Sequence, residues 1–161
     1  MTEDKKKLTL VRFSGEHDKA LAAFNIATTA AAMGKDVTIF FTFWGLNVIK
    51  KPEGRVPGTG MLALMNRMNR GGANRLKLSK FDMMGVGTSL MKRFMGRAGL
   101  PSLEQMLTMG KQLGLHYVAC TTTMGVMGLT EQDFIPEVES FAGAATYLGE
   151  ADGASVNLFI S

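Results

Sequence analysis

The architecture of this chain follows from residues 115–125, which read LHYVACTTTMG. The first six of these residues form an apolar, β-rich run that predicts a buried strand. The three threonines and the glycine that follow predict a loop beginning after Cys120. In an open sheet of parallel strands, chemistry takes place where the carboxyl ends of strands meet such connections. Cys120, the only cysteine of the 161 residues, stands at that position.

Hydrophobic periodicity on both sides of this stretch predicts alternating strands and helices. The near-apolar run 37–49 is too short to cross a bilayer and predicts a buried strand ending at Trp44-Gly45. Ser102 and Gln105 form a capping box that opens a helix. Short connections favour a three-layer α/β/α sandwich whose mostly parallel sheet has about five strands. The other expected elements are strands over 8–13, 138–141 and 156–160, helices over 19–33 and 144–151, and a short helix after Thr130.

The carboxyl edge of this sheet should bring together residues that are far apart in sequence. Backbone N–H groups in a turn stabilise a thiolate, which is the reactive form of cysteine. His17 lies in a loop at the same edge and either lowers the thiol pKa, orients a substrate, or is a solvated loop histidine. The residues expected to support Cys120 are Ser14, Gly15, Trp44, Gly45, Thr121, Thr122, Thr123 and Gly125.

Residues 52–101, called the Met-rich segment below, interrupt the alternating pattern as an insertion within a single domain spanning 1–161. Two groups of Met and Leu at helical spacing lie among its basic residues. From Lys50 to Arg97, eleven Lys and Arg face only Glu53 and Asp82, a charge of +9 in a chain whose total is +4. A membrane surface, an acidic protein or a second subunit suits this face. Specific nucleic-acid binding is not expected, because stacking residues are scarce.

Composition places the protein in a reducing compartment. One cysteine cannot form an internal disulfide, and no signal-type apolar stretch follows the charged N-terminus, so we expect a cytoplasmic location, with peripheral membrane contact as an option. Two separated histidines and one cysteine do not make a zinc site, and no cofactor fingerprint is present.

Spacing alone leaves the role of Cys120 open between a reactive thiol and a small buried hydrophobic residue. A Cys-x-x-Cys pair is absent, which excludes dithiol chemistry. His116 lies four residues away on the same strand, about 13 Å from Cys120 at the usual strand rise, and cannot act as its direct base.

Several blocks spread over nearly the whole chain resemble the DsrE/DsrF-like sulfur-trafficking superfamily, and within it the DsrE2 branch. They are FSG and DKALAAF (13–15 and 18–24), AAMG (31–34) and FFTFWGL (40–46), MMG (83–85), VAC and MGVMG (118–120 and 124–128), and ATYL with LFI (145–148 and 158–160).

This resemblance implies a self-associating α/β/α domain whose cysteine, matching Cys120, carries sulfane sulfur as a persulfide. The implied partners are rhodanese-like and TusA-like proteins, with Trp44 and the Met-rich segment shielding the sulfur. Some relatives have a second cysteine that is absent here, which leaves transfer through a single sulfur. Whether the protein is an enzyme stays open. The rival interpretations are a non-catalytic oligomeric module with an inert Cys120 and a flavodoxin-like nucleotide-binding protein.

Overall fold

A computed structural model describes residues 6–161 and contains one five-stranded, all-parallel sheet. Its strand order is β4-β3-β2-β1-β5, so the first strand lies inside the sheet and the last strand in sequence forms one edge. This confirms the predicted α/β class and the predicted strand number. The strands are β1 (Lys7–Arg12), β2 (Asp36–Phe41), β3 (His116–Cys120), β4 (Ser140–Ala142) and β5 (Ala154–Ile160).

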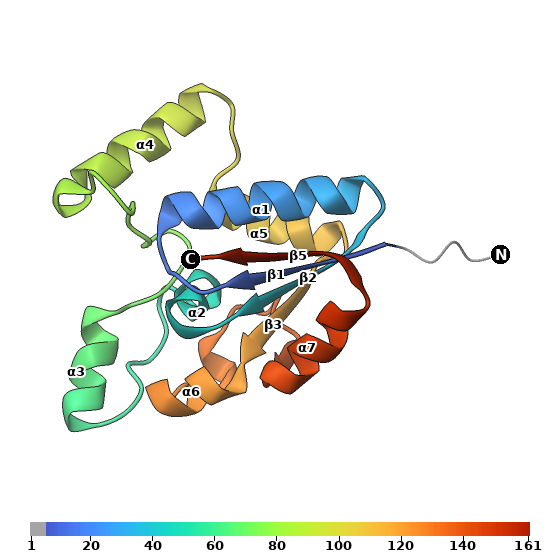
Figure 1. The fold of residues 1–161 in the computed structure, drawn as a ribbon. Coiled ribbons are helices and arrows are strands. Elements are labelled where there is room, and N and C mark those ends of the chain that lie inside the picture. Colours follow the sequence, from blue (N-terminus) through green and yellow to red (C-terminus); the bar gives the residue numbers. More distant parts are fainter. Residues whose placement is uncertain (1–5) are drawn as a thin grey trace.

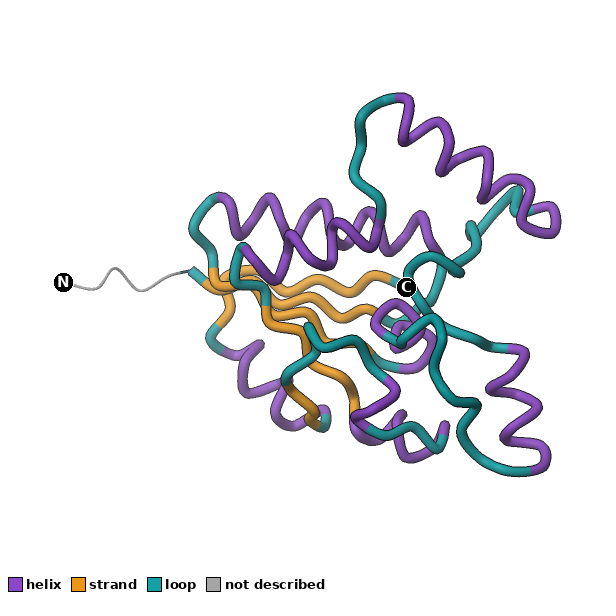
Figure 2. The backbone as a smooth tube through the Cα atoms, turned by 180° about the vertical axis from the view of Figure 1, so that it is seen from behind, coloured by secondary structure: helices purple, strands orange, loops and turns teal. Residues whose placement is uncertain are grey.

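Helices cover both faces of the sheet and complete the three layers. Helices α1 (His17–Ala32) and α5 (Leu103–Gln112) lie on one face, and α6 (Thr121–Met127) and α7 (Ala144–Asp152) lie on the other (Figure 1). The view from behind in Figure 2 shows the same layering. Between β2 and α5 the chain forms α2 (Leu46–Ile49), α3 (Gly60–Met68) and α4 (Val86–Arg97).

Small side chains let α1 pack closely on the sheet. Four alanines of α1 are buried, and Phe24 stacks on Phe41 of β2 and meets Tyr117 of β3 edge-on. The Tyr117 hydroxyl donates a hydrogen bond to the Leu107 carbonyl at 2.8 Å, which links β3 to α5. Burial of apolar side chains is the main contribution to the stability of such a core.

Two boundaries differ from the sequence prediction. The run 37–49 is not one strand, because β2 ends at Phe41, a 3-10 turn occupies Phe43–Gly45, and the four buried residues of α2 complete the run. A short apolar run does not distinguish a buried strand from a buried helix. The loop expected after Cys120 is also wrong, because α6 begins directly at Thr121. The capping box at Ser102 and the strand ending at Cys120 are confirmed.

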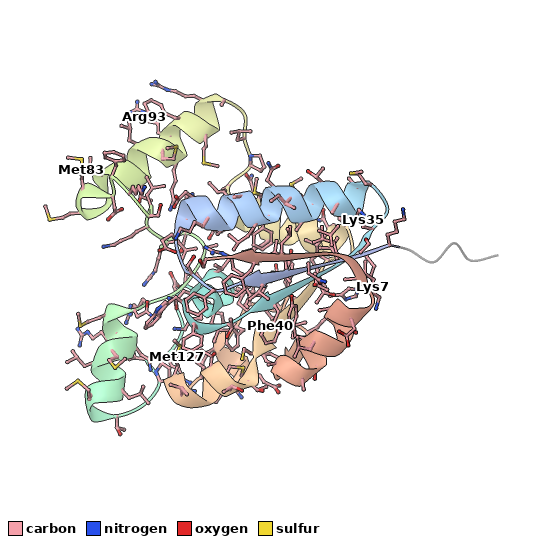
Figure 3. The ribbon with its side chains drawn as sticks, in the orientation of Figure 1. Lys7, Lys35, Phe40, Met83, Arg93 and Met127 are labelled. Carbon is pink, nitrogen blue, oxygen red and sulfur yellow. The ribbon has the colours of Figure 1, made fainter. Side chains whose placement is uncertain are left out.

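The Met-rich segment carries α3 and α4, which stand away from the sandwich near the carboxyl ends of the strands (Figure 1). Met61, Met68 and Met84 are exposed there. Met83, just before α4, and Arg93, within it, project away from the sheet (Figure 3). Among residues 6–161, none of the helices has both the length and the apolar character needed to cross a bilayer.

A buried arginine joins the loops at the carboxyl edge. Arg12, the last residue of β1, is fully buried, and its guanidinium donates hydrogen bonds to the Ser14 hydroxyl at 2.6 Å and to the carbonyls of Glu16 and Ile160. Its own carbonyl accepts a hydrogen bond from the Thr42 N–H at 3.0 Å. A Cβ added to Gly45 would lie 2.0 Å from that carbonyl oxygen. Only glycine fits this close approach between the two turns.

We predict that Gly45→Ala destabilises the protein by about 3 kcal/mol, because the added methyl group forces backbone atoms apart. Gly149→Ala is the matched control, since a Cβ at this exposed position in α7 meets no atom within 4 Å. That change should stabilise the protein by about 0.5–1 kcal/mol through helix propensity. Urea unfolding of both variants measures the difference. Equal stability of the two variants would contradict the packing described here.

Candidate functional site at Cys120

Cys120 is both the last residue of β3 and the N-cap residue of α6. Strand alternation turns Tyr117 and Ala119 toward the main core, whereas Cys120 packs with Val11 and Phe40 on the opposite face of the sheet. The side chain is 5% exposed. Because the helix starts without an intervening loop, the sulfur lies beside backbone N–H groups that have no partner within the helix.

Hydrogen bonds to the sulfur outweigh the effect of its burial. Burial raises the pKa of the Cys120 thiol, but the backbone N–H and hydroxyl of Thr123, the hydroxyl of Thr42 and the backbone N–H of Thr122 lower it. The net pKa lies below the ordinary value of a cysteine. Donors that favour the anion give a thiol nucleophilic character without a neighbouring base.

Thr123 also holds the turn that follows β2. Its hydroxyl lies 3.1 Å from the Thr42 hydroxyl and accepts a hydrogen bond from the Phe43 N–H at 3.2 Å. Phe43 has a φ angle of 47°, in the left-handed region that non-glycine residues rarely adopt. A strained backbone of this kind persists where surrounding contacts hold it, and it is concentrated at functional sites.

The sulfur faces a cavity of about 670 Å³. One wall comes from α3 in the Met-rich segment, and another comes from α6. Phe40 and Met127, which line the cavity, lie on the side of the sheet covered by α6 and α7 (Figure 3). The lining is mostly apolar and includes Phe43, Trp44, Leu62, Met65, Met68, Val126 and Ala144, with Thr122 and Thr123 near the sulfur.

The structure brings some of the predicted supporting residues to this cavity and places others elsewhere. Trp44, Thr122 and Thr123 line it with Cys120. The other predicted residues do not line it. The Ser14 hydroxyl accepts a hydrogen bond from Arg12, and Gly45 packs against the Arg12 carbonyl. Gly15 lies against the Trp44 carbonyl and lines a separate pocket, and Thr121 and Gly125 are exposed.

Sequence reasoning missed Thr42. It expected the Met-rich segment to shield the sulfur but did not identify α3 as the part that lines the cavity. Thr42 follows β2 and therefore stands at the same sheet edge as Cys120, a signal that was available in the sequence. The contribution of α3 depends on how the Met-rich segment folds back over the edge, which no periodicity encodes.

His17 is not a solvated loop residue, which was one of the alternatives that the sequence left open. It begins α1 and is 2% exposed, and neither ring nitrogen has a hydrogen-bond partner within the described part of the chain, residues 6–161. Burial and, to a smaller extent, the charge of Lys92 together lower the pKa of His17 to about 4, against the opposing effect of Asp18. It lines a different cavity from that of Cys120. No group of three or more His, Cys, Asp and Glu side chains able to hold a metal ion occurs among the described residues.

Comparison with known proteins identifies the family of this chain. Residues 4–159 match the sequence profile of the DsrE/DsrF/DrsH-like family. The chain belongs to this family. It is 42% identical to the uncharacterized protein YrkE of Bacillus subtilis over 99% of this chain and 100% of that protein. It is 32% identical to the sulfur carrier protein DsrE2 of Allochromatium vinosum, over 98% of this chain and 99% of that protein.

Solved structures share the fold at low sequence identity. The ychN protein of E. coli aligns with a TM-score of 0.57 at 12% identity, covering 96% of this chain and 99% of the other. The protein MTH1491 of Methanobacterium thermoautotrophicum aligns with a TM-score of 0.52 at 9% identity over the same shares. This DsrE/DsrF/DrsH-like protein therefore has the fold of those chains.

We predict that Thr123→Val raises the pKa of Cys120, because the hydroxyl donor to the thiolate is lost. The rate of alkylation by iodoacetamide, measured from pH 5 to pH 10, reports this pKa. In Thr123→Val the rate should begin to rise at a higher pH than in the wild type, and it should be slower at pH 7. Thr123→Ser should restore the profile, and Thr121→Val, a change at an exposed position, should leave it unaltered. An unshifted profile for Thr123→Val would count against these hydrogen bonds.

A second prediction concerns the pH dependence of folding. Because the pKa of His17 falls from 6.5 to about 4 on folding, protonation favours the unfolded chain as the pH drops from 6.5 to 4. The wild type should lose about 3 kcal/mol more than His17→Gln between pH 7 and pH 4, at 1.36 kcal/mol per pKa unit. Urea unfolding at both pH values measures this difference. The control His116→Gln keeps His17 and should lose as much stability between pH 7 and pH 4 as the wild type. If His17→Gln also loses that much, His17 is not the residue responsible.

Proposed function

We propose that this protein carries sulfane sulfur as a persulfide on Cys120 and transfers it between protein partners. The observation that carries the proposal is a thiol with a lowered pKa that faces a cavity large enough to admit another group. A relative that is 32% identical over nearly the whole chain is named a sulfur carrier protein, which supports the same chemistry here.

The transfer step needs a nucleophile and a leaving group but no base. The Cys120 thiolate attacks the terminal sulfur of a donor persulfide, R–S–SH, forming a new S–S bond as the donor's S–S bond breaks. The products are Cys120–S–SH and the donor thiolate R–S⁻, so charge and sulfur oxidation states balance. The donors of Thr122 and Thr123 that favour the thiolate also favour the persulfide anion.

The cavity walls protect this intermediate. Trp44 and the methionines of α3 surround the space into which the second sulfur extends, and apolar walls limit access of water and dissolved oxidants. Because methionine is flexible and polarizable, such walls adapt to different occupants. A partner delivers or removes sulfur through the same opening, since the chain has one cysteine.

A second candidate function rests on the exposed surface of α3 and α4. Both helices carry apolar side chains that are at least about half exposed, including Leu64, Met65, Leu90 and Phe94, among basic residues. Large exposed apolar patches mark interaction sites. In this alternative the protein is an oligomeric recruiting module for an acidic partner or a membrane surface, and Cys120 is inert.

The deciding experiment is intact-protein mass spectrometry after incubation with a persulfide-loaded donor protein. We expect wild type to gain about 32 Da, one sulfur atom, and to lose it when a thiol acceptor is added. Cys120→Ser should gain nothing. Thr123→Val should load more slowly at pH 7, because less of its Cys120 is thiolate.

Filling the cavity provides a matched test of access. Val126→Trp places a large side chain in the wall and should slow loading severalfold, whereas Val86→Trp, at an exposed position outside the cavity, should load at the wild-type rate. Folded wild-type protein that remains unmodified by donors would refute the carrier function and favour the recruiting module.

A further inference from the structure

A second, more polar cavity of about 260 Å³ lies between α1, α4 and α5. It shares no lining residue with the Cys120 cavity. Its wall contains His17 at the start of α1, Lys92 from α4, and Ser102, Leu103 and Glu104 at the start of α5. None of these residues has a part in the sulfur transfer proposed above.

The unsatisfied imidazole of His17 is the first sign that this cavity has a ligand. Both ring nitrogens are buried and find no hydrogen-bond partner among the residues that the structure describes, although buried polar groups are nearly always paired. The side chain is 2% exposed and borders the cavity, so a molecule bound in the cavity can reach it. Leaving such a group unpaired costs about 1–3 kcal/mol.

The groups around His17 are donors and carry positive charge. The N–H groups of Leu103 and Glu104 occupy the first two positions of the ten-residue helix α5, where no helical carbonyl is available to accept them. The helix dipole adds partial positive charge at this end. Lys92 donates one hydrogen bond to the Asn74 carbonyl at 2.6 Å, which holds its ammonium group at the cavity and leaves two further N–H donors.

One acidic residue, Glu104, lines the cavity, and Asp18 lies next to His17 in the sequence. Asp18, next to His17, accepts hydrogen bonds from the backbone and side chain of Ser79. Glu104 is exposed at the rim, so its carboxylate can lie in solvent while its backbone N–H faces inward. A cation would meet Lys92 and the positive end of α5, and an apolar ligand would leave the ring nitrogens of His17 unpaired.

We propose that this cavity is a binding site for a small tetrahedral oxyanion of the phosphate and sulfate class. The backbone N–H groups at the start of α5, the Lys92 ammonium and an N–H of His17 donate to its oxygens, a combination typical of anion sites at helix N-termini. The volume holds one such ion with some water. This site is independent of the sulfur-carrier proposal.

The two histidines of the chain make the test internally controlled. His116 is exposed and lies beside Asp36 and Glu139, surroundings that disfavour an anion. We expect the imidazole NMR signals of His17 to shift saturably as sodium phosphate is added at pH 7, with ionic strength held constant by sodium chloride. The imidazole signals of His116 should not shift as phosphate is added. Sodium sulfate should give the same response.

Charge variants on one helix supply the second control. Lys92→Gln should weaken phosphate binding about tenfold, because one charge-assisted hydrogen bond is lost. Arg93→Gln, which removes a neighbouring charge that does not line the cavity, should titrate like wild type. Thermal unfolding gives a readout that does not depend on the NMR signals. Phosphate should raise the melting temperature of the wild type above its value in chloride. It should not raise that of His17→Gln.

Three results would each overturn the proposal. They are no saturable shift of His17, equal shifts of His17 and His116, and equal loss of affinity in Lys92→Gln and Arg93→Gln. The last two would show screening of surface charge instead of a site.

Discussion

The site depends on one constraint, which is that β3 passes into α6 without an intervening residue. Cys120 closes the strand and caps the helix, so its sulfur lies within reach of the first free N–H groups of α6. Thr123, one turn into that helix, contacts Thr42 at the end of β2 and fixes the strained turn at Phe43. Thr123, whose hydroxyl joins the two strand ends, also lowers the pKa of the thiol, so local stability and reactivity have a common origin.

A second set of polar contacts sets the position of Trp44. Arg12 has no exposure, and burial lowers its pKa to about 10 against the opposing charges of Glu16 and Asp18, so it stays protonated at neutral pH. A buried cation needs hydrogen-bond partners, and the two terminal nitrogens of Arg12 donate to the loop after β1 and to the end of β5, whereas its Nε has no partner among residues 6–161. Gly45 packs directly on the Arg12 carbonyl. The tryptophan that borders the Cys120 cavity is thereby anchored to the inner strand β1.

The Met-rich segment contributes to two cavities of opposite character. Helix α3 brings methionines and a leucine to the cysteine, and α4 brings Lys92 to the buried histidine. An apolar wall suits a soft, polarizable sulfur, whereas amide and ammonium donors suit a hard oxyanion. Both cavities lie near the carboxyl edge of the parallel sheet, where strand-to-helix connections leave backbone donors free. One segment thus lines two different parts of the same edge.

Local sequence signals predicted most of the framework. Period-two and period-3.6 patterns, the Ser102 capping box and the run ending at Cys120 determine the parallel α/β sandwich, because these signals act between residues a few positions apart. They also placed Trp44, Thr122 and Thr123 beside the cysteine. Local patterns could not separate strand from helix within 37–49, nor reveal that α6 begins at Thr121, since both outcomes depend on contacts with distant segments. Only tertiary packing decided that Thr42 and α3 contribute to the cysteine site, that His17 is buried, and which residues line each of the two cavities. Packing brings together side chains that are tens of positions apart in the sequence. It also alters their pKa by removing water from around them.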